Sequence, residues 1–310
     1  EVRQWLRYAV EHQADAHAGG EQHREPAGIG VIRRRIRPAK PHRAHRGHDQ
    51  QKAEDHEDVR RAEEEPVKAL GHAVEEPAEH RSRLLGQRQR VEHERVLANR
   101  ENDGRPLASI LVVEHDPVLT VSKRPSAREN IIVGAERLEA LGIEVHETDR
   151  GGDITYHGPG QVVVYPIVDL NRVGLNLHAY MRLLEEAVIR TCSTFGLEAG
   201  REEGATGVWV PSRVHPGQRA KICAMGVRVR RWVTMHGLAL NVSTDLSHFE
   251  TIVPCGLTGR AVTSLRAELG NDAPSQPEAA ASVCGHLIEL LFGAHQSGLS
   301  RSERKRSQSD

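Results

Sequence analysis

The stretch RGGDITYHGPGQVVVYPIVDL, residues 150–170, decides the fold. Its second half, QVVVYPIVDL, is a continuous apolar run, which is typical of a strand that is buried on both faces. Its first half holds four glycines and a proline between positions 151 and 160, and it contains neither GxGxxG nor GxxxxGK[ST]. Glycine lets a backbone approach a ligand closely. We therefore interpret this half as a loop that lines a ligand pocket other than a nucleotide-phosphate site, and His157 as either a ligand contact or a satisfied polar group.

The chain on both sides of this stretch alternates between short strands and a few helices. Apolar or alternating runs bounded by turn residues predict strands in LASILVVEHDPVLTV (107–121, two strands), IEVHETD (143–149), GVWV (207–210), KICAMGVRVRRWV (221–233) and MHGLALNV (235–242). Apolar residues at helical spacing predict helices over 134–142, 177–196 and 276–295. In the second of these helices one face is formed by Leu177, Tyr180, Leu184, Ala187, Val188 and Cys192. Strands outnumber helices, which predicts an α+β (mixed α/β) fold in a single domain.

The first part of the chain has a different composition. Residues 1–80 contain 9 of the 19 histidines but no Ser, Thr or Asn. The segment therefore lacks ordinary turn and cap chemistry, and its few apolar residues do not offset the entropy of folding. We expect 1–83 to be a disordered or non-native N-terminal extension, followed by one folded domain at 84–295 and a polar C-terminal tail at 296–310. The alternative for the extension is a His-rich metal-binding tail or a basic tether.

Composition excludes several classes of protein. The 310 residues carry 42 Lys and Arg against 43 Asp and Glu, which argues against a protein that mainly binds duplex nucleic acid. No apolar run approaches the roughly 18–20 residues that span a bilayer, and we expect no signal peptide at the start of the chain. The four cysteines are too few and too irregularly spaced for a disulfide framework or a paired CxxC zinc site. We expect a soluble, cytoplasmic monomer with no metal, cofactor, nucleic-acid or membrane partner.

Cys255 is the candidate nucleophile. It lies between a proline and a glycine in TIVPCGLTG, where a turn can present the thiol, whereas Cys192 and Cys284 fall on apolar helix faces and are expected in the core. A thiol with a pKa of about 8.5 is only a few per cent thiolate near pH 7 and needs a nearby cation or base. The candidates for that partner are Lys221, His157 and His236. Lys221 is alternatively a rim residue whose stem covers the core.

These motifs resemble the octanoyltransferase family, the lipoyl(octanoyl) transferases. The resemblance rests on EHDPVLT (114–120), the stretch 150–170, GVWV, KICAMGVRVRRWVTMHGLALNV (221–242) and IVPCGLTGRAVTSL (252–265), in family order and spacing, and it covers about residues 84–295. It implies the lipoate/biotin protein ligase fold, which is class II synthetase-like. It also implies an acyltransferase that moves an octanoyl group from octanoyl-acyl carrier protein, through a cysteine thioester, to the lysine of lipoyl domains, the first step of endogenous protein lipoylation. The implied acceptors are 2-oxoacid dehydrogenase acyltransferase subunits and the glycine-cleavage carrier protein.

The resemblance also implies roles for particular residues. Cys255 matches the family's acyl-carrying cysteine, and Lys221 matches the lysine that lowers the pKa of that thiol. The implied acyl pocket consists of Arg150, Gly151, Gly152, Asp153, Ile154, Thr155, Tyr156, His157, Ala224, Met225, Gly226, Gly237, Leu238 and Ala239. We expect the eight-carbon chain to contact Val162, Ala224, Met225 and Leu238, and an acidic carrier protein to dock on Arg124, Arg150, Arg228 and Arg230. The sequence departs from the family mainly at SKRPSAREN (122–130) and at the variable positions Cys223 and Met225.

Three alternatives stay open at this point. An ATP-dependent lipoate- or biotin-type protein ligase would need the lysine but not the cysteine, and it would need an adenylate-binding glycine loop that we do not find. A non-catalytic member of the fold would bind acyl chains without transfer, although such a copy usually loses either Lys221 or Cys255. A thiol hydrolase would use Cys255 with His157 or His236 and release free octanoate.

Overall fold

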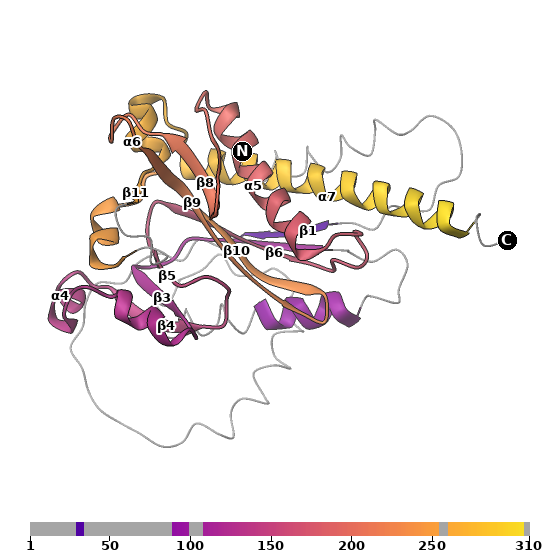
Figure 1. The fold of residues 1–310 in the computed structure, drawn as a ribbon, viewed down its shortest axis with the longest axis horizontal. Helices are drawn as coiled ribbons and strands as arrows, with labels where there is room; N and C mark the ends of the chain where they lie inside the picture. Colours follow the sequence, from indigo (N-terminus) through magenta and orange to yellow (C-terminus); the bar gives the residue numbers. More distant parts are fainter. Residues whose placement is uncertain (1–28, 34–88, 99–107, 254–259, 307–310) are drawn as a thin grey trace, which may run out of the picture.

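A large sheet forms the centre of the molecule (Figure 1). The structure is a computed structural model that describes residues 29–33, 89–98, 108–253 and 260–306. Within these residues the sheet has eight strands, and seven of them lie in the order β1-β2-β6-β10-β9-β8-β7, with β11 paired to β9. The strands are β1 (Ile29–Arg33), β2 (Ala108–Val113), β6 (Gln161–Val168), β7 (Gly200–Glu202), β8 (Ala205–Pro211), β9 (Arg219–Arg230), β10 (Val233–Asn241) and β11 (Ala261–Val262).

A small second sheet lies beside the first and is ordered β4-β3-β5. It consists of β3 (Val118–Ser122), β4 (Glu144–Thr148) and β5 (Ile154–His157). Its own apolar cluster includes Leu119, Ile154 and Tyr156. Short helical segments accompany the two sheets, namely η2 (Pro125–Asn130), α4 (Ala135–Ala140), η3 (Leu246–Thr251), α6 (Leu265–Leu269) and η5 (Gly270–Asp272).

Two long helices, α5 (Leu177–Thr194) and α7 (Gln276–Arg306), cover one face of the large sheet (Figure 1). Helix α5 begins at Asn176, whose side chain accepts a hydrogen bond from the N–H of Ala179. The apolar face predicted for this helix is buried except for Leu177, which is 46% exposed because it lies in the first turn at the edge of the core. The predicted closing helix 276–295 is present, and its backbone continues through Arg306.

Strands β2 and β6 are buried on both faces, which explains their uninterrupted apolar sequences. Along β6, Val162 and Val164 pack with α5 and α7. Val163 and Tyr165 face the other way, where Val96 of a helix over residues 89–98 packs against them. Because successive side chains of a strand point to opposite faces, β6 supplies side chains both to the main core and to the opposite face of the large sheet.

The sequence predicted the longer strands and helices of the domain, but it did not predict the helix 89–98, the short strands β7 and β11, or the short segments η2, η3, α6 and η5. Two further segments differ from the prediction. Residues 154–157, expected to belong to a loop, form β5 and pair with β3 of the small sheet. Within the N-terminal extension the structure describes one strand, β1, which pairs in parallel with β2. The rest of 1–83 lies outside the described residues. Among the helices that are described, none has the length and apolar character that crossing a membrane requires.

Candidate active site

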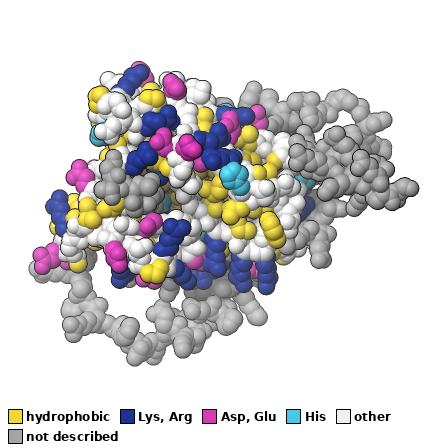
Figure 2. Space-filling model, in the orientation of Figure 1, with side chains coloured by type: hydrophobic (Ala, Val, Ile, Leu, Met, Phe, Trp, Pro, Cys, Tyr) yellow, Lys and Arg dark blue, Asp and Glu magenta, His cyan; other side chains and the backbone are white. Residues whose placement is uncertain are grey.

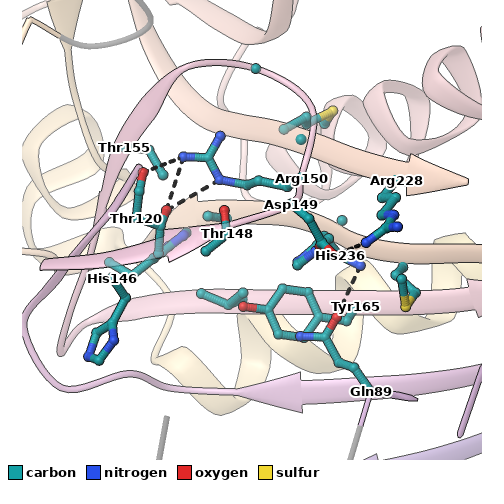
Figure 3. A pocket seen from close by; sticks show the side chains of 18 of the residues that line it. Gln89, Thr120, His146, Thr148, Asp149, Arg150, Thr155, Tyr165, Arg228 and His236 are labelled. Carbon is teal, nitrogen blue, oxygen red and sulfur yellow. Dashed lines mark hydrogen bonds and ion pairs between the residues drawn. The ribbon is translucent and has the colours of Figure 1, made fainter. Parts of the chain in front are cut away.

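A cavity of about 1160 Å³ (Figure 3) is lined by strands of both sheets. Helices α5 and α7 cover the other face of the large sheet (Figure 1). Four parts of the chain line it: the helix 89–98, the segment from His115 into β3, the segment from β4 through the glycine-rich loop into β5, and the facing strands β6, β9 and β10. The predicted pocket residues in this lining are Arg150, Gly152, Asp153, Ile154, Thr155, His157, Ala224, Met225, Gly226, Gly237, Leu238 and Ala239. The structure therefore brings the predicted segments 150–157, 224–226 and 237–239 to one cavity.

The glycine-rich loop lies directly on β9. The N–H of Gly151 donates to the carbonyl oxygen of Val227 at 2.9 Å. A Cβ at Gly226 would stand 2.5 Å from the carbonyl oxygen of Gly151, and one at Gly151 would stand 2.9 Å from that of Val227. No side chain fits between these two backbones, so glycine is required at both positions.

Arg150 is held by uncharged partners across the mouth of the loop (Figure 3). Its Nη2 donates to the carbonyl oxygen of Thr120 at 2.6 Å and to Oγ1 of the same residue at 3.0 Å. Its Nε also donates to this Oγ1, at 3.2 Å. These bonds join the loop to β3 and fix a positive charge on the cavity wall.

Asp149 connects the loop to the β9–β10 hairpin (Figure 3). It forms an ion pair with Arg228, and its Oδ1 lies 2.9 Å from Nε2 of His236. His236 has φ of 60°, a left-handed conformation that is rare for residues other than glycine, and its N–H donates to Oε1 of Gln89. Such conformations persist where the surroundings enforce them, often at functional sites. Burial, followed by the nearby Arg150 and Arg228, lowers the pKa of His236 to about 4, so the ring is neutral near pH 7.

Two further histidines form the inner wall of the cavity. The rings of His115 and His157 stack with centroids 5.2 Å apart. Nε2 of His115 lies 2.9 Å from the hydroxyl of Tyr165, and Nδ1 of His157 lies 2.7 Å from Oε1 of Gln161. Burial is the main cause that lowers the pKa of His115 to about 4 and that of His157 well below its usual value. Near pH 7 both rings are therefore neutral.

Apolar residues of the three central strands complete the lining: Val163, Ala224, Met225, Met235, Leu238 and Ala239. The side chains of Met225 and Leu238 also pack with the cluster on the side of α5 and α7. Three of the four residues predicted to contact the acyl chain line the cavity, and Val162 does not. Val162 faces α5 and α7, and its neighbour Val163 lines the cavity instead. A strand buried on both faces gives no sequence signal that tells its two sides apart, so the assignment to Val162 was off by one residue.

Lys221 is buried at the start of β9 and is 7% exposed. Its Nζ lies 4.8 Å from the ring centroid of Trp209, a cation–π distance. The register of β8 and β9 shifts between Val208 and Trp209, and this places Trp209 opposite Lys221. Lys221 is not among the cavity-lining residues, and β11, next to the segment that carries Cys255, pairs in parallel with β9 at this position. Cys255 itself lies outside the described residues.

The other predicted residues divide into two groups. Tyr156 and Gly151 do not line the cavity, and Tyr156 points into the core of the small sheet, where its hydroxyl lies 2.7 Å from Nδ1 of His248. Cys192, Cys223 and Cys284 are buried and form no disulfide with one another, as expected for the first and third. Burial raises the pKa of Cys192 to about 12 and that of Cys223 further. Neither Cys192 nor Cys223 is therefore a nucleophile near pH 7.

Several lining residues escaped the sequence analysis. Gln89 and His93 belong to a helix without a clear apolar period, so no sequence signal marked them. His115 lies in the motif EHDPVLT, where its presence in a turn between two strands was the only available signal. Within the described residues, no group of three or more His, Cys, Asp or Glu side chains is arranged to hold a metal ion.

Comparison with known proteins identifies the family. The family model described as "Lipoyl protein ligase A/B catalytic domain" matches residues 87–287. An octanoyltransferase of Flavobacterium johnsoniae is 50% identical over 59% of this chain and 77% of its own length. An octanoyltransferase of Acidobacterium capsulatum is 46% identical over 68% of this chain and 88% of its own length. The chain belongs to the octanoyltransferase family. It is an acyltransferase.

A solved structure supports the same fold. A bi-partite lipoate protein ligase from Thermoplasma acidophilum superposes with a TM-score of 0.51 at 19% identity, covering 67% of this chain and 80% of that one. At this level of identity the likeness concerns the fold alone. The octanoyltransferase-family chain therefore has the lipoate protein ligase fold that its motifs predicted.

Proposed function

We propose that the protein transfers an octanoyl group from octanoyl-acyl carrier protein to the lysine of lipoyl domains, through a thioester on Cys255. The observation that carries this proposal is the cavity in which the segments 150–157, 224–226 and 237–239 meet. The octanoyltransferases to which the chain is similar support the choice of acyl group and reaction. Burying the six methylenes and the methyl of an octanoyl chain against Val163, Ala224 and Ala239 would contribute about 5.6 kcal/mol, at about 0.8 kcal/mol per carbon.

The proposed reaction has two acyl-transfer steps. In the first, the Cys255 thiolate attacks the carbonyl carbon of the octanoyl thioester, the bond from this carbon to the carrier sulfur breaks, and the carrier thiolate takes up a proton. In the second, the neutral lysine amine attacks the same carbon, the bond to the Cys255 sulfur breaks, and the amine nitrogen loses a proton. Exchange of one thioester for another is nearly balanced and formation of an amide is downhill, so neither step requires ATP.

Lys221 is proposed as the group that activates Cys255. If its ammonium lowers the thiol pKa from about 8.5 to about 7, the thiolate fraction at pH 7 rises from a few per cent to about half, equivalent to about 2 kcal/mol. Two observations support its position: the side chain is buried, and the N–H of Thr263, shortly after Cys255 in the chain, donates to the Lys221 carbonyl oxygen at 3.0 Å.

Intact-mass spectrometry tests the covalent step. The full chain is incubated with octanoyl-acyl carrier protein, with and without a lipoyl domain. We expect an octanoyl adduct that hydroxylamine removes, that is absent in Cys255→Ala, and that disappears when the lipoyl domain is added. Lys221→Met should form the adduct more slowly below pH 8 and approach the wild-type rate at higher pH. A labile adduct of the same mass in Cys255→Ala would contradict the assignment.

The two rival reactions have distinct products. An ATP-dependent ligase would modify the lipoyl domain from free octanoate and ATP, and we expect no product under those conditions. A thiol hydrolase would release free octanoate without forming the amide. Measuring the lipoyl-domain amide and free octanoate in the same reaction separates both rivals from the proposed transferase.

The donor, the oligomeric state and the location complete the proposal. Of the arginines expected to dock an acidic carrier, Arg228 pairs with Asp149 and Arg150 with Thr120. The Arg230 side chain, at the end of β9, is 53% exposed and lies 3.9 Å from the equally exposed carboxylate of Glu94. Basic side chains gather along the lower edge of the surface in Figure 2. We expect Arg230→Glu to raise the KM for the carrier substrate, and an unchanged KM would remove Arg230 from the docking surface.

We also propose that the protein is a monomer, which light scattering tests. We propose that it works in the cytoplasm, where its thiols stay reduced.

A further inference from the structure

A chain of buried side-chain amides joins the cavity to the strand of Lys221. Nδ2 of Asn241 donates to the carbonyl oxygen of Thr263 at 3.0 Å. Nε2 of Gln161 donates to Oδ1 of Asn241 at 2.8 Å, and Oε1 of Gln161 lies 2.7 Å from Nδ1 of His157. Gln161 and Asn241 are 1% and 3% exposed, so water cannot substitute for a missing partner.

The direction of every hydrogen bond in this chain is fixed by backbone carbonyls. The carbonyl oxygen of Thr263 only accepts, so Asn241 must turn its NH₂ group toward it and its oxygen toward Gln161. Gln161 must then present its NH₂ group to that oxygen, and the same group lies 3.3 Å from a second backbone carbonyl, that of Tyr156. Two independent carbonyls therefore orient the Gln161 amide in the same way. Its oxygen is left facing Nδ1 of His157, which has to carry a proton.

The series of hydrogen-bonded amides begins at Thr263, which lies beside Lys221. The N–H of Thr263 donates to the Lys221 carbonyl oxygen, and β11 pairs with β9 at this residue. Oγ1 of Thr263 also donates to the buried carboxylate of Glu268 at 2.6 Å. Thr263 is therefore held from two sides, and the carbonyl that orients the amides is fixed relative to the strand of Lys221.

The surroundings of His157 keep the ring neutral. The positively chargeable groups near it are His115, which stacks on it, Arg150 from the glycine-rich loop, and His236 from β10. Burial and these groups all disfavour a second proton and lower the pKa of His157. A neutral ring with a proton on Nδ1 has its lone pair on Nε2. No hydrogen bond of Nε2 to another described residue is found, and the ring lines the cavity.

We propose that Gln161 and Asn241 are positioning residues that hold His157 as the neutral Nδ1–H tautomer, so that Nε2 accepts a hydrogen bond from the amine that attacks the acyl group. The identity of this amine as a lysine of the acyl acceptor rests on the function proposed above. The tautomer itself does not, because it follows from the amide chain alone. In this arrangement His157 does not donate to the acyl carbonyl oxygen. It orients the N–H of the nucleophile so that the nitrogen lone pair is directed at the carbonyl carbon.

Nitrogen NMR of the histidine rings tests the tautomer directly. The full chain is labelled with ¹⁵N-histidine, and the His157 ring signals are assigned by their loss in His157→Gln. Between pH 6 and pH 8 we expect Nδ1 at the shift of a protonated ring nitrogen and Nε2 at that of an unprotonated one. A proton on Nε2, or an average of the two tautomers, would overturn the proposal without any reference to enzymatic activity.

Two variants test the role of the amides. Gln161→Met and Asn241→Leu remove the polar atoms at similar side-chain volume, and both should shift the His157 signals toward a mixture of tautomers. Thr191→Val is the matched control, because it removes a buried hydrogen bond to the Ala187 carbonyl in helix α5, away from the cavity. Unchanged His157 signals in a folded Gln161→Met protein would contradict the proposal, and the wild-type spectrum remains decisive if both variants fail to fold.

Single-turnover kinetics test the consequence for the reaction. Octanoyl enzyme is prepared and mixed with a lipoyl domain, and amide formation is followed separately from acylation of Cys255. We expect Gln161→Met to slow amide formation about 10- to 100-fold, a part of the roughly 100- to 10,000-fold that positioned proton acceptors contribute, while acylation changes less than about threefold. Equal slowing of both steps would indicate a general structural role. If wild-type protein forms no octanoyl enzyme, the proposed function fails while the tautomer assignment stands.

Discussion

Substituting alanine for Gly226 tests the contact between the glycine-rich loop and β9. The added Cβ would lie 2.5 Å from the Gly151 carbonyl oxygen and 3.2 Å from Cδ of Arg150. Contacts of this kind below 3.0 Å are essentially never seen, so the loop has to move by at least 0.5 Å. The movement stretches the 2.9 Å hydrogen bond from Gly151 to Val227 and carries Asp149 and Arg150 with it.

The expected effects on stability and on activity differ in size. Loss of the loop hydrogen bond costs about 0.5–1.5 kcal/mol, and the reduced backbone entropy of the unfolded alanine variant offsets about 0.4–1 kcal/mol of this. The free energy of unfolding of Gly226→Ala should therefore fall by about 1 kcal/mol or less. The rate of octanoyl transfer should fall more than the stability does, because misplacement of binding groups by about 1 Å can reduce a rate about 100-fold. We expect kcat/KM for octanoyl transfer to fall about 10- to 100-fold.

Urea denaturation and transfer kinetics are measured on the same preparations. Gly285→Ala is the matched control, because a Cβ at that position of helix α7 meets nothing within 4 Å. It should raise the free energy of unfolding by about 0.5–1 kcal/mol and leave the kinetics unchanged. If Gly226→Ala has wild-type kcat/KM, the loop tolerates the displacement, and its close approach to β9 does not position the cavity residues.

Three further predictions concern stability. Arg231 and Trp232 form the turn between β9 and β10 with φ of 51° and 65°, so the double replacement by Asn and Gly should stabilise the protein by about 1 kcal/mol in urea titrations; a loss of stability would contradict this. The pKa values of His115 and His236 fall from 6.5 to about 4 on folding. The stabilisation of the folded state that the two neutral rings provide is therefore complete above about pH 6.5 and is lost as the pH drops toward 4. The urea midpoint of the wild-type protein should be lower at pH 5 than at pH 7, and this decrease should be smaller in His236→Asn. An equal decrease in the two proteins would exclude His236 as a cause. Trp209 is fully buried, and Trp209→Leu should reduce the free energy of unfolding by about 2–4 kcal/mol in calorimetry, whereas a change below about 1 kcal/mol would show that the site collapses around the smaller side chain.

Sequence patterns predicted elements whose signal is local. Alternation and turn residues located the strands of 107–121 and 143–149, and apolar spacing located the helix 177–196. The segments of the pocket came from motifs, and the structure brings most of them to one cavity. What the sequence could not supply is the direction in which a residue faces when both sides of its strand are buried, as the exchange of Val162 for Val163 shows.

Long-range partners were also beyond sequence reasoning. The helix 89–98 has only a weak apolar period, yet Gln89 and His93 lie in the lining of the cavity. The amide chain from Thr263 to His157 links positions 106 residues apart, and no property of Asn241 or Gln161 taken alone indicates it. Contacts of this kind depend on strand register, which is set by the whole sheet.

The two-sided burial of β6 has a consequence for how new substrate preferences can arise in this fold. Val163 pairs directly with Ala239 across β6 and β10, and both line the cavity, while Val162 and Val164 contact only the helical side. If the cavity holds the acyl chain as proposed, we expect a change in size at the first pair to alter the length of acyl chain that fits without touching the residues that pack against α5 and α7. Under that proposal, selection for a shorter or longer acyl group would act on alternate residues of one strand, apart from those that hold the two long helices.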